Sequence, residues 1–151
     1  MKIKLFKNVT LPKKSHLQDS GLDCFMPESF SLQPLETKTI GLGIGILVPE
    51  GFAGMLVPRS SIAEKGLIIQ TAIIDPDYTG EIHLIITNCS NNVVNIEKNS
   101  RVCSLVVYNV LNVRLDIVND FEKTERNNRG LGSTGRWLLY LTLKFSNTIH
   151  Y

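Results

Sequence analysis

The feature that most constrains this chain is its succession of short β-branched and apolar runs separated by turn residues, with no sustained helical periodicity. Such runs are typical of β-strands, because branched side chains pack well on a pleated surface. Many short strands with turns at regular intervals favour an all-β barrel or sandwich of the jelly-roll type. The sequence shows no internal repeat and no low-complexity segment.

Turn residues separate the segments that carry the strand pattern. The first such segment has glycines at every second position, facing away from isoleucines and leucines. Residues 75–80 form a turn-rich link, so the strands on either side of it are expected to pair as a hairpin. A capping-box pattern at Ser61 and Glu64 is the one good helix start, and it predicts a turn or two of helix before Gly66. The predicted strands are residues 39–48, 52–57, 67–74, 81–87, 93–96, 101–110 and 113–118.

The length of 151 residues suits one domain that buries its own core. The longest apolar stretch, residues 40–48, is much shorter than the roughly 18 residues of a membrane span. Charges interrupt every apolar region near the N-terminus, so no secretion signal is predicted. Cys24, Cys89 and Cys103 lack Cys-x-x-Cys spacing and are expected to be buried, reduced thiols. We therefore expect an intracellular protein, cytoplasmic or nuclear, that contacts no membrane.

Composition and charge divide the chain into three predicted parts. Residues 1–123 hold the β-barrel domain, residues 124–135 lack an apolar face and form a mobile lid, and residues 136–151 form an apolar tail extension. The tail is expected to dock on its own sheet or on a neighbour, because its side chains would otherwise form an exposed patch. The alternative is a frayed, aggregation-prone end. Residues 1–14 carry five lysines and no acid, so they could bind nucleic acid or a phosphate-bearing ligand, or could simply be solvated.

Two segments near predicted turns carry side chains suited to phosphate chemistry. Residues 75–80 (DPDYTG) hold two carboxylates and a tyrosine, which could position a water and a ring-shaped substrate. The alternative is that Asp and Gly merely form the turn. Residues 57–61 place Arg59 and two hydroxyls before the expected helix, where they could bind phosphate or simply cap that helix.

A third segment combines glycines with positive charge. Residues 130–135 (GLGSTG) have Arg126, Arg129 and Arg136 around them. Glycines allow backbone N–H groups to approach a polyphosphate closely, and arginines neutralise its charge. Residues 20–23 form a short acidic turn, which by itself is more simply structural.

The order of these segments is more specific than any one of them. Residues 20–23, 58–61, 74–82, Arg101 and residues 126–135 follow one another as the five motifs of the trimeric dUTPases do. The chain resembles that family over about residues 1–135. The resemblance implies a jelly-roll-like all-β subunit and a homotrimer with active sites at the subunit interfaces. It also implies hydrolysis of dUTP to dUMP and pyrophosphate with Mg²⁺ as cofactor, which supplies dUMP and limits uracil in DNA.

The resemblance further implies a role for each matching residue. Asp75 would be the catalytic base that deprotonates the attacking water, and Tyr78 would pack on the deoxyribose and exclude a 2′-hydroxyl. Asp23 would lie near the metal and contact it through water. The other substrate-binding positions would be the uracil-reading backbone of Ala72, Ile74 and His83, the phosphate-binding Arg59, Ser60 and Ser61, and the lid residues Arg126, Leu131, Gly132, Ser133 and Thr134.

The chain departs from the family pattern at several positions. Ser104 stands where a glutamine usually reaches the phosphates, and Leu131 stands where an aromatic ring usually stacks over uracil. An aliphatic cover loses about 1 kcal/mol of stacking. Asn127 and Arg129 replace two glycines, and the tail after residue 135 is longer than the family needs. We expect an active enzyme with altered kinetics.

Two other classes of protein compete with this interpretation. A dCTP deaminase shares the subunit fold, but it needs a glutamate where this chain has Ile85, so deamination is disfavoured. A non-catalytic or weakly catalytic regulator would bind nucleotide and a protein partner, the latter through the C-terminal tail. Ser104 and Leu131 keep that alternative open. Direct binding to nucleic acid is not expected.

Overall fold

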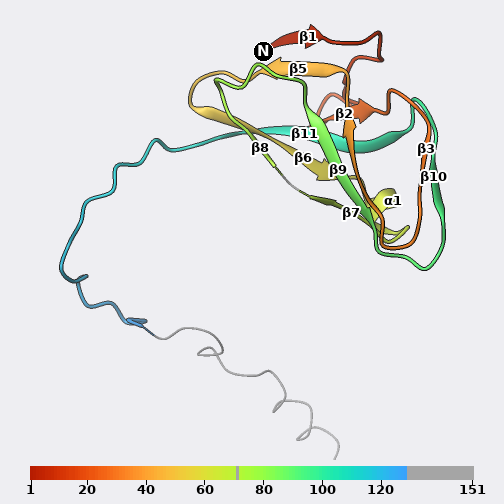
Figure 1. Cartoon of the computed structure of the whole chain (residues 1–151). Coiled ribbons are helices and arrows are strands. Elements are labelled where there is room, and N and C mark those ends of the chain that lie inside the picture. Colours follow the sequence, from red (N-terminus) through yellow and green to blue (C-terminus); the bar gives the residue numbers. More distant parts are fainter. Residues whose placement is uncertain (71, 129–151) are drawn as a thin grey trace, which may run out of the picture. The chain divides into compact units, whose positions relative to one another are not determined.

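The computed structural model describes residues 1–70 and 72–128, and the chain divides into two units, Met1–Val113 and Arg114–Tyr151 (Figure 1). Within these described ranges, every helix and strand belongs to the first unit. None of the described helices is long or apolar enough to cross a membrane. The elements are β1 (Lys2–Leu5), β2 (Gly21–Phe25), β3 (Phe30–Leu32), β4 (Thr37–Gly41), β5 (Ile44–Leu47), β6 (Phe52–Pro58), α1 (Ser60–Ala63), β7 (Leu67–Gln70), β8 (Ile73–Ile74), β9 (His83–Asn88), β10 (Val94–Ile96) and β11 (Arg101–Asn109).

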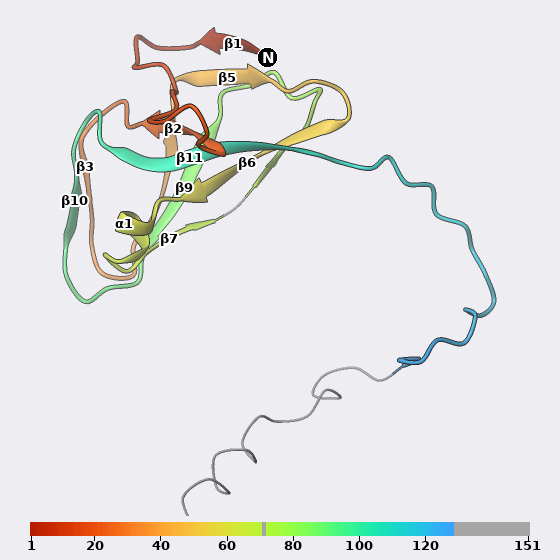
Figure 2. The ribbon, with the colours of Figure 1, turned by 180° about the vertical axis from the view of Figure 1, so that it is seen from behind.

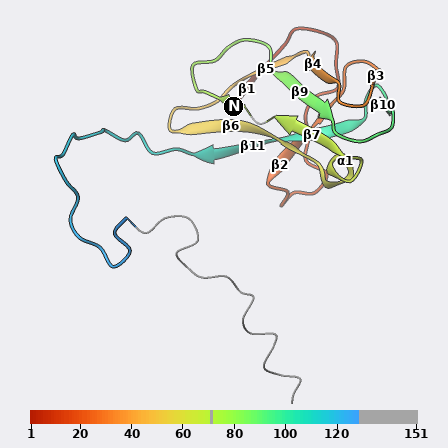
Figure 3. The same cartoon turned by 60° about the horizontal axis from the view of Figure 1, so that its bottom comes forward.

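The strands form antiparallel sheets, which confirms the all-β prediction. The largest sheet has the order β2-β11-β6-β8, and a second sheet has the order β4-β9-β7. Two strand pairs, β1-β5 and β10-β3, complete the arrangement. Figure 3 shows β11 between β6 and β2, and Figure 2 shows β3 beside β10. The described residues do not close these sheets into the predicted barrel.

One apolar core joins the sheets. It draws on nearly every strand and includes Leu32, Leu84, Ile86 and Leu105, each at most 1% exposed. Asn88 is also fully buried, but its amide donates to three backbone carbonyls and its oxygen accepts from Ser90. A buried polar side chain with all its bonds made is compatible with an apolar core.

The predicted strand over residues 39–48 is two strands, β4 and β5. The chain breaks at Gly43, which has φ +73, a conformation that favours glycine. The break lets residue 82 insert between the two strands, because Leu42 N–H donates to the Ile82 carbonyl at 2.9 Å and Ile82 N–H donates to the Ile44 carbonyl at 2.8 Å. Gly41 and Gly45 make room for the turn before β9, because an added Cβ would meet Glu81 at position 41 and the Gly80 carbonyl at position 45.

Three local predictions are wrong. Residues 113–118 form no strand, and Leu115 is 92% exposed, because nothing in the described chain pairs with this segment. Residues 20–23 belong largely to β2 rather than to a turn, because β11 supplies hydrogen-bonding partners for them. The predicted capping box does not form: Arg59 is the N-cap of α1 and makes no side-chain capping bond.

The predicted first strand of the hairpin, residues 67–74, is also two strands. β7 pairs with β9 as expected, whereas β8 pairs with β6. The short strands β1, β2 and β3 were not predicted from the sequence.

The cysteine prediction is confirmed at two of its three positions. Cys24 and Cys103 are buried opposite each other on β2 and β11, whereas Cys89 is exposed. The hydrogen bond with Cys24, together with burial, raises the pKa of the Cys103 thiol, so this thiol stays protonated.

Candidate active site

The first group of candidate residues surrounds the Asp23 carboxylate at one end of the largest sheet. The strand register places Ser104 of β11 opposite Asp23 of β2, and Cys103 opposite Pro58, the residue before Arg59. Two strands and the residue that follows β6 therefore bring polar side chains to one point.

The loop before β2 adds a fourth side chain. Backbone bonds link Lys13 and Asp23 in both directions, at 2.8 and 3.2 Å, and so hold the neighbouring Ser15 beside the carboxylate. Ser15 Oγ donates to Asp23 Oδ2 at 3.1 Å and itself accepts from Arg101 Nη1 at 2.7 Å. Nothing in the sequence pattern indicated this role for Ser15.

Four donors occupy the Asp23 carboxylate. Oδ1 accepts from Arg59 Nη1 and from Ser104 Oγ, the latter at 2.8 Å. Oδ2 accepts from Ser15 and from Arg101 Nη1, the latter at 3.1 Å. Because a carboxylate offers about four lone-pair positions, this one is fully used.

The surroundings of Asp23 keep its carboxyl ionised. Burial acts to raise the pKa of Asp23, whose side chain is only 8% exposed. Hydrogen bonds from Arg59, Ser104 and Ser15, together with the Arg59 charge, outweigh burial, so the pKa of this carboxyl lies below its ordinary value. Asp23 therefore holds both guanidinium groups in place at neutral pH.

A cavity of about 430 Å³ opens beside this cluster. The guanidinium side chains remain partly exposed, at 30% for Arg59 and 44% for Arg101, whereas Asp23 is covered. Partly exposed guanidinium groups beside hydroxyls are suited to binding phosphate. The cavity is lined by Ser15, His16, Asp19, Gly21, Asp23, Arg59, Arg101 and Ser104.

The second group of candidate residues lies in the turn between β8 and β9. Asp75 directly follows β8 and is exposed, as are Ala72, Tyr78 and His83, whereas Ile74 is buried. The Tyr78 N–H donates to the Asp75 carbonyl at 3.2 Å, which closes the turn. The exposed carboxylate and the exposed phenol of this turn are both accessible to a ligand.

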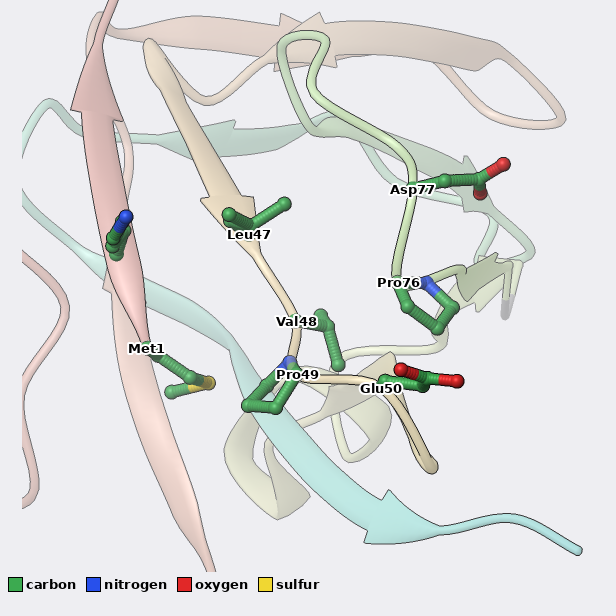
Figure 4. Close-up of a pocket in the computed structure, with 8 residues that line it drawn as sticks. Met1, Leu47, Val48, Pro49, Glu50, Pro76 and Asp77 are labelled. Carbon is green, nitrogen blue, oxygen red and sulfur yellow. The ribbon is translucent and has the colours of Figure 1, made fainter.

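A pocket of about 580 Å³ lies beside the same turn (Figure 4). Its apolar part includes Met1, Leu47 and Pro49, and Glu50 and Asp77 contribute carboxylates. Among the side chains that line this pocket there are two carboxylates and one lysine, so it is less suited to a triphosphate than the arginine cavity.

The structure does not bring the two groups together within one chain. Ile74 lies opposite Gly54 on β6, and the chain then continues toward Asp75 while β6 runs the other way toward Arg59. If this register continues, Asp75 lies beside the position of β6 that is six residues before Arg59. Six residues of extended chain span about 20 Å. A single ligand that contacts both groups of one chain would therefore have to span about 20 Å.

The remaining predicted site residues lie at the start of α1, in the second unit or outside the described residues. Ser60 and Ser61 are exposed at the start of α1. Arg126 lies in a turn of the second unit, where Thr124 and Asn127 exchange hydrogen bonds of 3.1 and 3.0 Å. Asn127 has φ +46, a conformation that glycine adopts easily and asparagine tolerates, so this replacement suits its position. The lid positions Leu131, Gly132, Ser133 and Thr134, and the tail over 136–151, lie outside the described residues.

Known proteins resemble this chain over most of its length. A model of the dUTPase family matches residues 7–135. The chain is 35% identical to the deoxyuridine 5'-triphosphate nucleotidohydrolase of Trichodesmium erythraeum, over 87% of this chain and 95% of that protein. It is also 35% identical to the protein of the same name from Finegoldia magna, over 89% of this chain and 99% of that protein.

A solved structure shares the fold. The dUTPase of Staphylococcus bacteriophage 80alpha, determined with dUPNHPP, superposes with a TM-score of 0.84 and 28% identity, over 89% of this chain and 98% of that one. The family match and the relatives agree with the motif order along the chain. This chain belongs to the dUTPase family.

Proposed function

We propose that this chain hydrolyses dUTP to dUMP and pyrophosphate at sites that are completed only when copies of the chain assemble. One observation carries the proposal: the chain presents an arginine-lined cavity and, about 20 Å away, an exposed turn with Asp75 and Tyr78. A nucleotide triphosphate carries anionic phosphates at one end and a sugar and base at the other. Both groups of residues can act on it only if they come from different copies.

Asp75 is the proposed general base. Its exposed carboxylate accepts a proton from water as the water oxygen forms a bond to the α-phosphorus. The bond from the α-phosphorus to the bridging oxygen breaks, and pyrophosphate leaves with that electron pair. Attack in line with the leaving group suits phosphoryl transfer, where positioning and charge stabilisation dominate catalysis.

The same turn selects the nucleoside. Tyr78 would pack against the deoxyribose and leave no space for a 2′-hydroxyl. The backbone of Ala72, Ile74 and His83 would hydrogen-bond the uracil edge, in the manner of a base pair. Backbone groups suit this task because their donors and acceptors are fixed by the strands on either side.

The phosphate groups would lie against the other group of residues. Arg59 with Ser60 and Ser61 would supply charge and hydroxyl donors, and Arg101 would reinforce them. The proposed lid would close over the nucleotide from a further copy. It comprises Arg126, Leu131, Gly132, Ser133 and Thr134.

The described residues do not fit a protein-bound metal. They include no group of three or more His, Cys, Asp or Glu side chains able to hold one. Asp23, which the family resemblance puts near the water shell of Mg²⁺, has its lone pairs occupied by four donors, two of them guanidinium groups. We therefore assign Asp23 to orienting the arginines, and Mg²⁺ would be held by the phosphates of the nucleotide itself.

Release of pyrophosphate tests the proposal. The parent protein should hydrolyse dUTP in preference to dCTP, dTTP and UTP, and Asp75→Asn should lower kcat by about 10²–10⁴-fold while dUTP binding stays within a few-fold. The amide keeps the shape of the side chain but cannot take the proton. An Asp75→Asn variant that retains turnover within a few-fold of the parent contradicts the assignment of the base.

A second candidate function, control of a protein partner by nucleotide binding, is favoured by one observation. The structures of the 80alpha protein are described as phage dUTPases that control transfer of virulence genes by a proto-oncogenic G protein-like mechanism. Calorimetry with dUTP distinguishes the two functions for this chain. Tight binding without pyrophosphate release would favour the regulator over the enzyme.

A further inference from the structure

Ser15, which lies before the first of the five motif segments, forms a closed set of three hydrogen bonds with Asp23 and Arg101. Arg101 Nη1 donates to Ser15 Oγ at 2.7 Å and to Asp23 Oδ2 at 3.1 Å. Ser15 Oγ donates in turn to the same Oδ2, at 3.1 Å. Both N–H groups of Nη1 are therefore used, one by the hydroxyl and one by the carboxylate.

The loop that carries Ser15 is closed on both sides of this residue. On the N-terminal side, Lys13 and Asp23 exchange backbone hydrogen bonds of 2.8 and 3.2 Å. On the C-terminal side, the His16 N–H donates to the Asp19 carboxylate at 2.8 Å, and the Asp19 N–H donates to the His16 carbonyl at 3.1 Å. None of these bonds involves the hydroxyl of Ser15, so the loop should keep its shape when that hydroxyl is removed.

Two hydrogen bonds fix the plane of the Arg101 guanidinium group, and Ser15 accepts the shorter one. The side chain of Arg101 is 44% exposed, so water competes for its donors. The bond to Asp23 alone would let the planar group turn about one contact, whereas the second bond prevents that turn. Within the described residues, the hydrogen bonds of this group come from Nη1, which leaves the N–H groups of Nη2 and Nε available to a ligand in the cavity.

We propose that Ser15 is a positioning residue for phosphate binding: its hydroxyl holds the Arg101 guanidinium group in the orientation in which Arg101 binds the phosphates of the nucleotide. This inference rests on the proposed function in one respect, that the arginine cavity holds the phosphates. Without the hydroxyl, Arg101 keeps its bond to Asp23 but has more freedom to lose when a phosphate binds. That additional loss of conformational entropy weakens binding.

Calorimetric titration with dUPNHPP, the ligand of the 80alpha structure, measures this effect. Ser15→Ala should raise the Kd about fivefold, the factor that corresponds to one net hydrogen bond. Ser15→Thr keeps the hydroxyl and should stay within about twofold of the parent. The matched control is Ser20→Ala, which changes an exposed serine of the same loop that does not line the cavity in the described structure and should leave the Kd unchanged.

The kinetics of dUTP hydrolysis give a second readout. The phosphates that Arg101 would bind are present in the substrate and in the transition state. Ser15→Ala should therefore raise KM about fivefold and keep kcat within about twofold of the parent. A fall in kcat at unchanged KM would overturn the proposed role of Ser15.

A double variant separates an effect through Arg101 from an effect on the loop. In an Arg101→Ala background, Ser15→Ala should not change the Kd further, because the group that Ser15 orients is absent. Losses of affinity that multiply in the double variant overturn the role of Ser15. If Ser15→Ala does not fold, as judged by circular dichroism, Ser15→Val replaces it: this variant has the shape of Ser15→Thr without the hydroxyl and should show the same fivefold loss.

The same measurements separate failure of this inference from failure of the proposed function. If the parent hydrolyses dUTP but Ser15→Ala binds dUPNHPP as the parent does, the role of Ser15 is overturned and the proposed function stands. If the parent binds dUPNHPP but releases no pyrophosphate from dUTP, the proposed hydrolysis fails and the Kd values still decide the role of Ser15. A parent protein that does not bind dUPNHPP overturns both.

Discussion

At the scale of single residues, the most consequential contact is the one between Asp23 and its four donors. It joins β2, β11, the residue after β6 and the loop before β2 through one buried carboxylate. Ser104 is part of this arrangement: its hydroxyl donates to Asp23 at 2.8 Å. The serine that replaces the family's glutamine is thus used inside the cluster to orient Arg59 and Asp23.

This contact makes stability depend on pH in a defined direction. The pKa of Asp23 is lowered in the folded chain, so its contribution to stability is fully present above the unfolded pKa, near 3.9, and is lost as pH falls through the lower folded pKa. Asp23→Asn removes the charge at every pH. We expect it to lower the free energy of unfolding by about 2–4 kcal/mol at pH 7, with the difference from the parent shrinking below about pH 4.

Urea unfolding of both proteins between pH 3 and pH 8 measures this difference. Asp19→Asn serves as the control, because Asp19 lines the same cavity but forms no ion pair there in the described structure. A difference between parent and Asp23→Asn that stays constant down to pH 3 would contradict the assigned cause.

At the scale of elements, residues 111–118 carry a strand pattern but pair with no strand of the described chain. Apolar residues at 111, 113, 115 and 117 alternate with polar ones, and Ile117 is fully exposed. Period-two alternation favours a strand with one buried face, yet a strand also needs a neighbour to bond. We expect this segment to become a strand when copies assemble.

Ile117→Glu tests that expectation. A charge on the apolar face should weaken assembly, which light scattering coupled to size exclusion would detect as a lower mass at micromolar concentration. Arg114→Glu alters the charge on the opposite face of the same segment and should leave the mass unchanged. If Ile117→Glu assembles as the parent does, this face is not buried between copies.

The strands that could be predicted from the sequence are those marked by a continuous apolar run with turn residues on both sides. The strands β6, β9 and β11 were predictable because their apolar runs are long and bounded by turns. The N-terminal strands were not, because all four residues of β1 are exposed and β2 depends on pairing with distant β11. Motif order identified Arg59, Asp75 and Tyr78 as candidates, whereas the contact of Ser15 with Asp23 is created only by the fold.

At the scale of the whole molecule, one chain holds both parts of the proposed site but keeps them apart. The arginine cavity lies where β2, β6 and β11 meet, and the Asp75 turn follows β8 in the opposite direction. Cyclic assembly of identical chains brings one surface of each copy against a different surface of the next. A trimer of this kind would build each site from Asp75 of one copy and Arg59 of another.

Hybrid oligomers test this claim most directly. Asp75→Asn and Arg59→Ala should each inactivate a pure oligomer, and co-expression with two different tags allows mixed oligomers to be purified. If each site takes Asp75 and Arg59 from different copies, a mixed trimer contains one site with both residues intact and should recover about a third of the parental dUTP hydrolysis. Mixed oligomers as inactive as the pure variants would contradict the shared site.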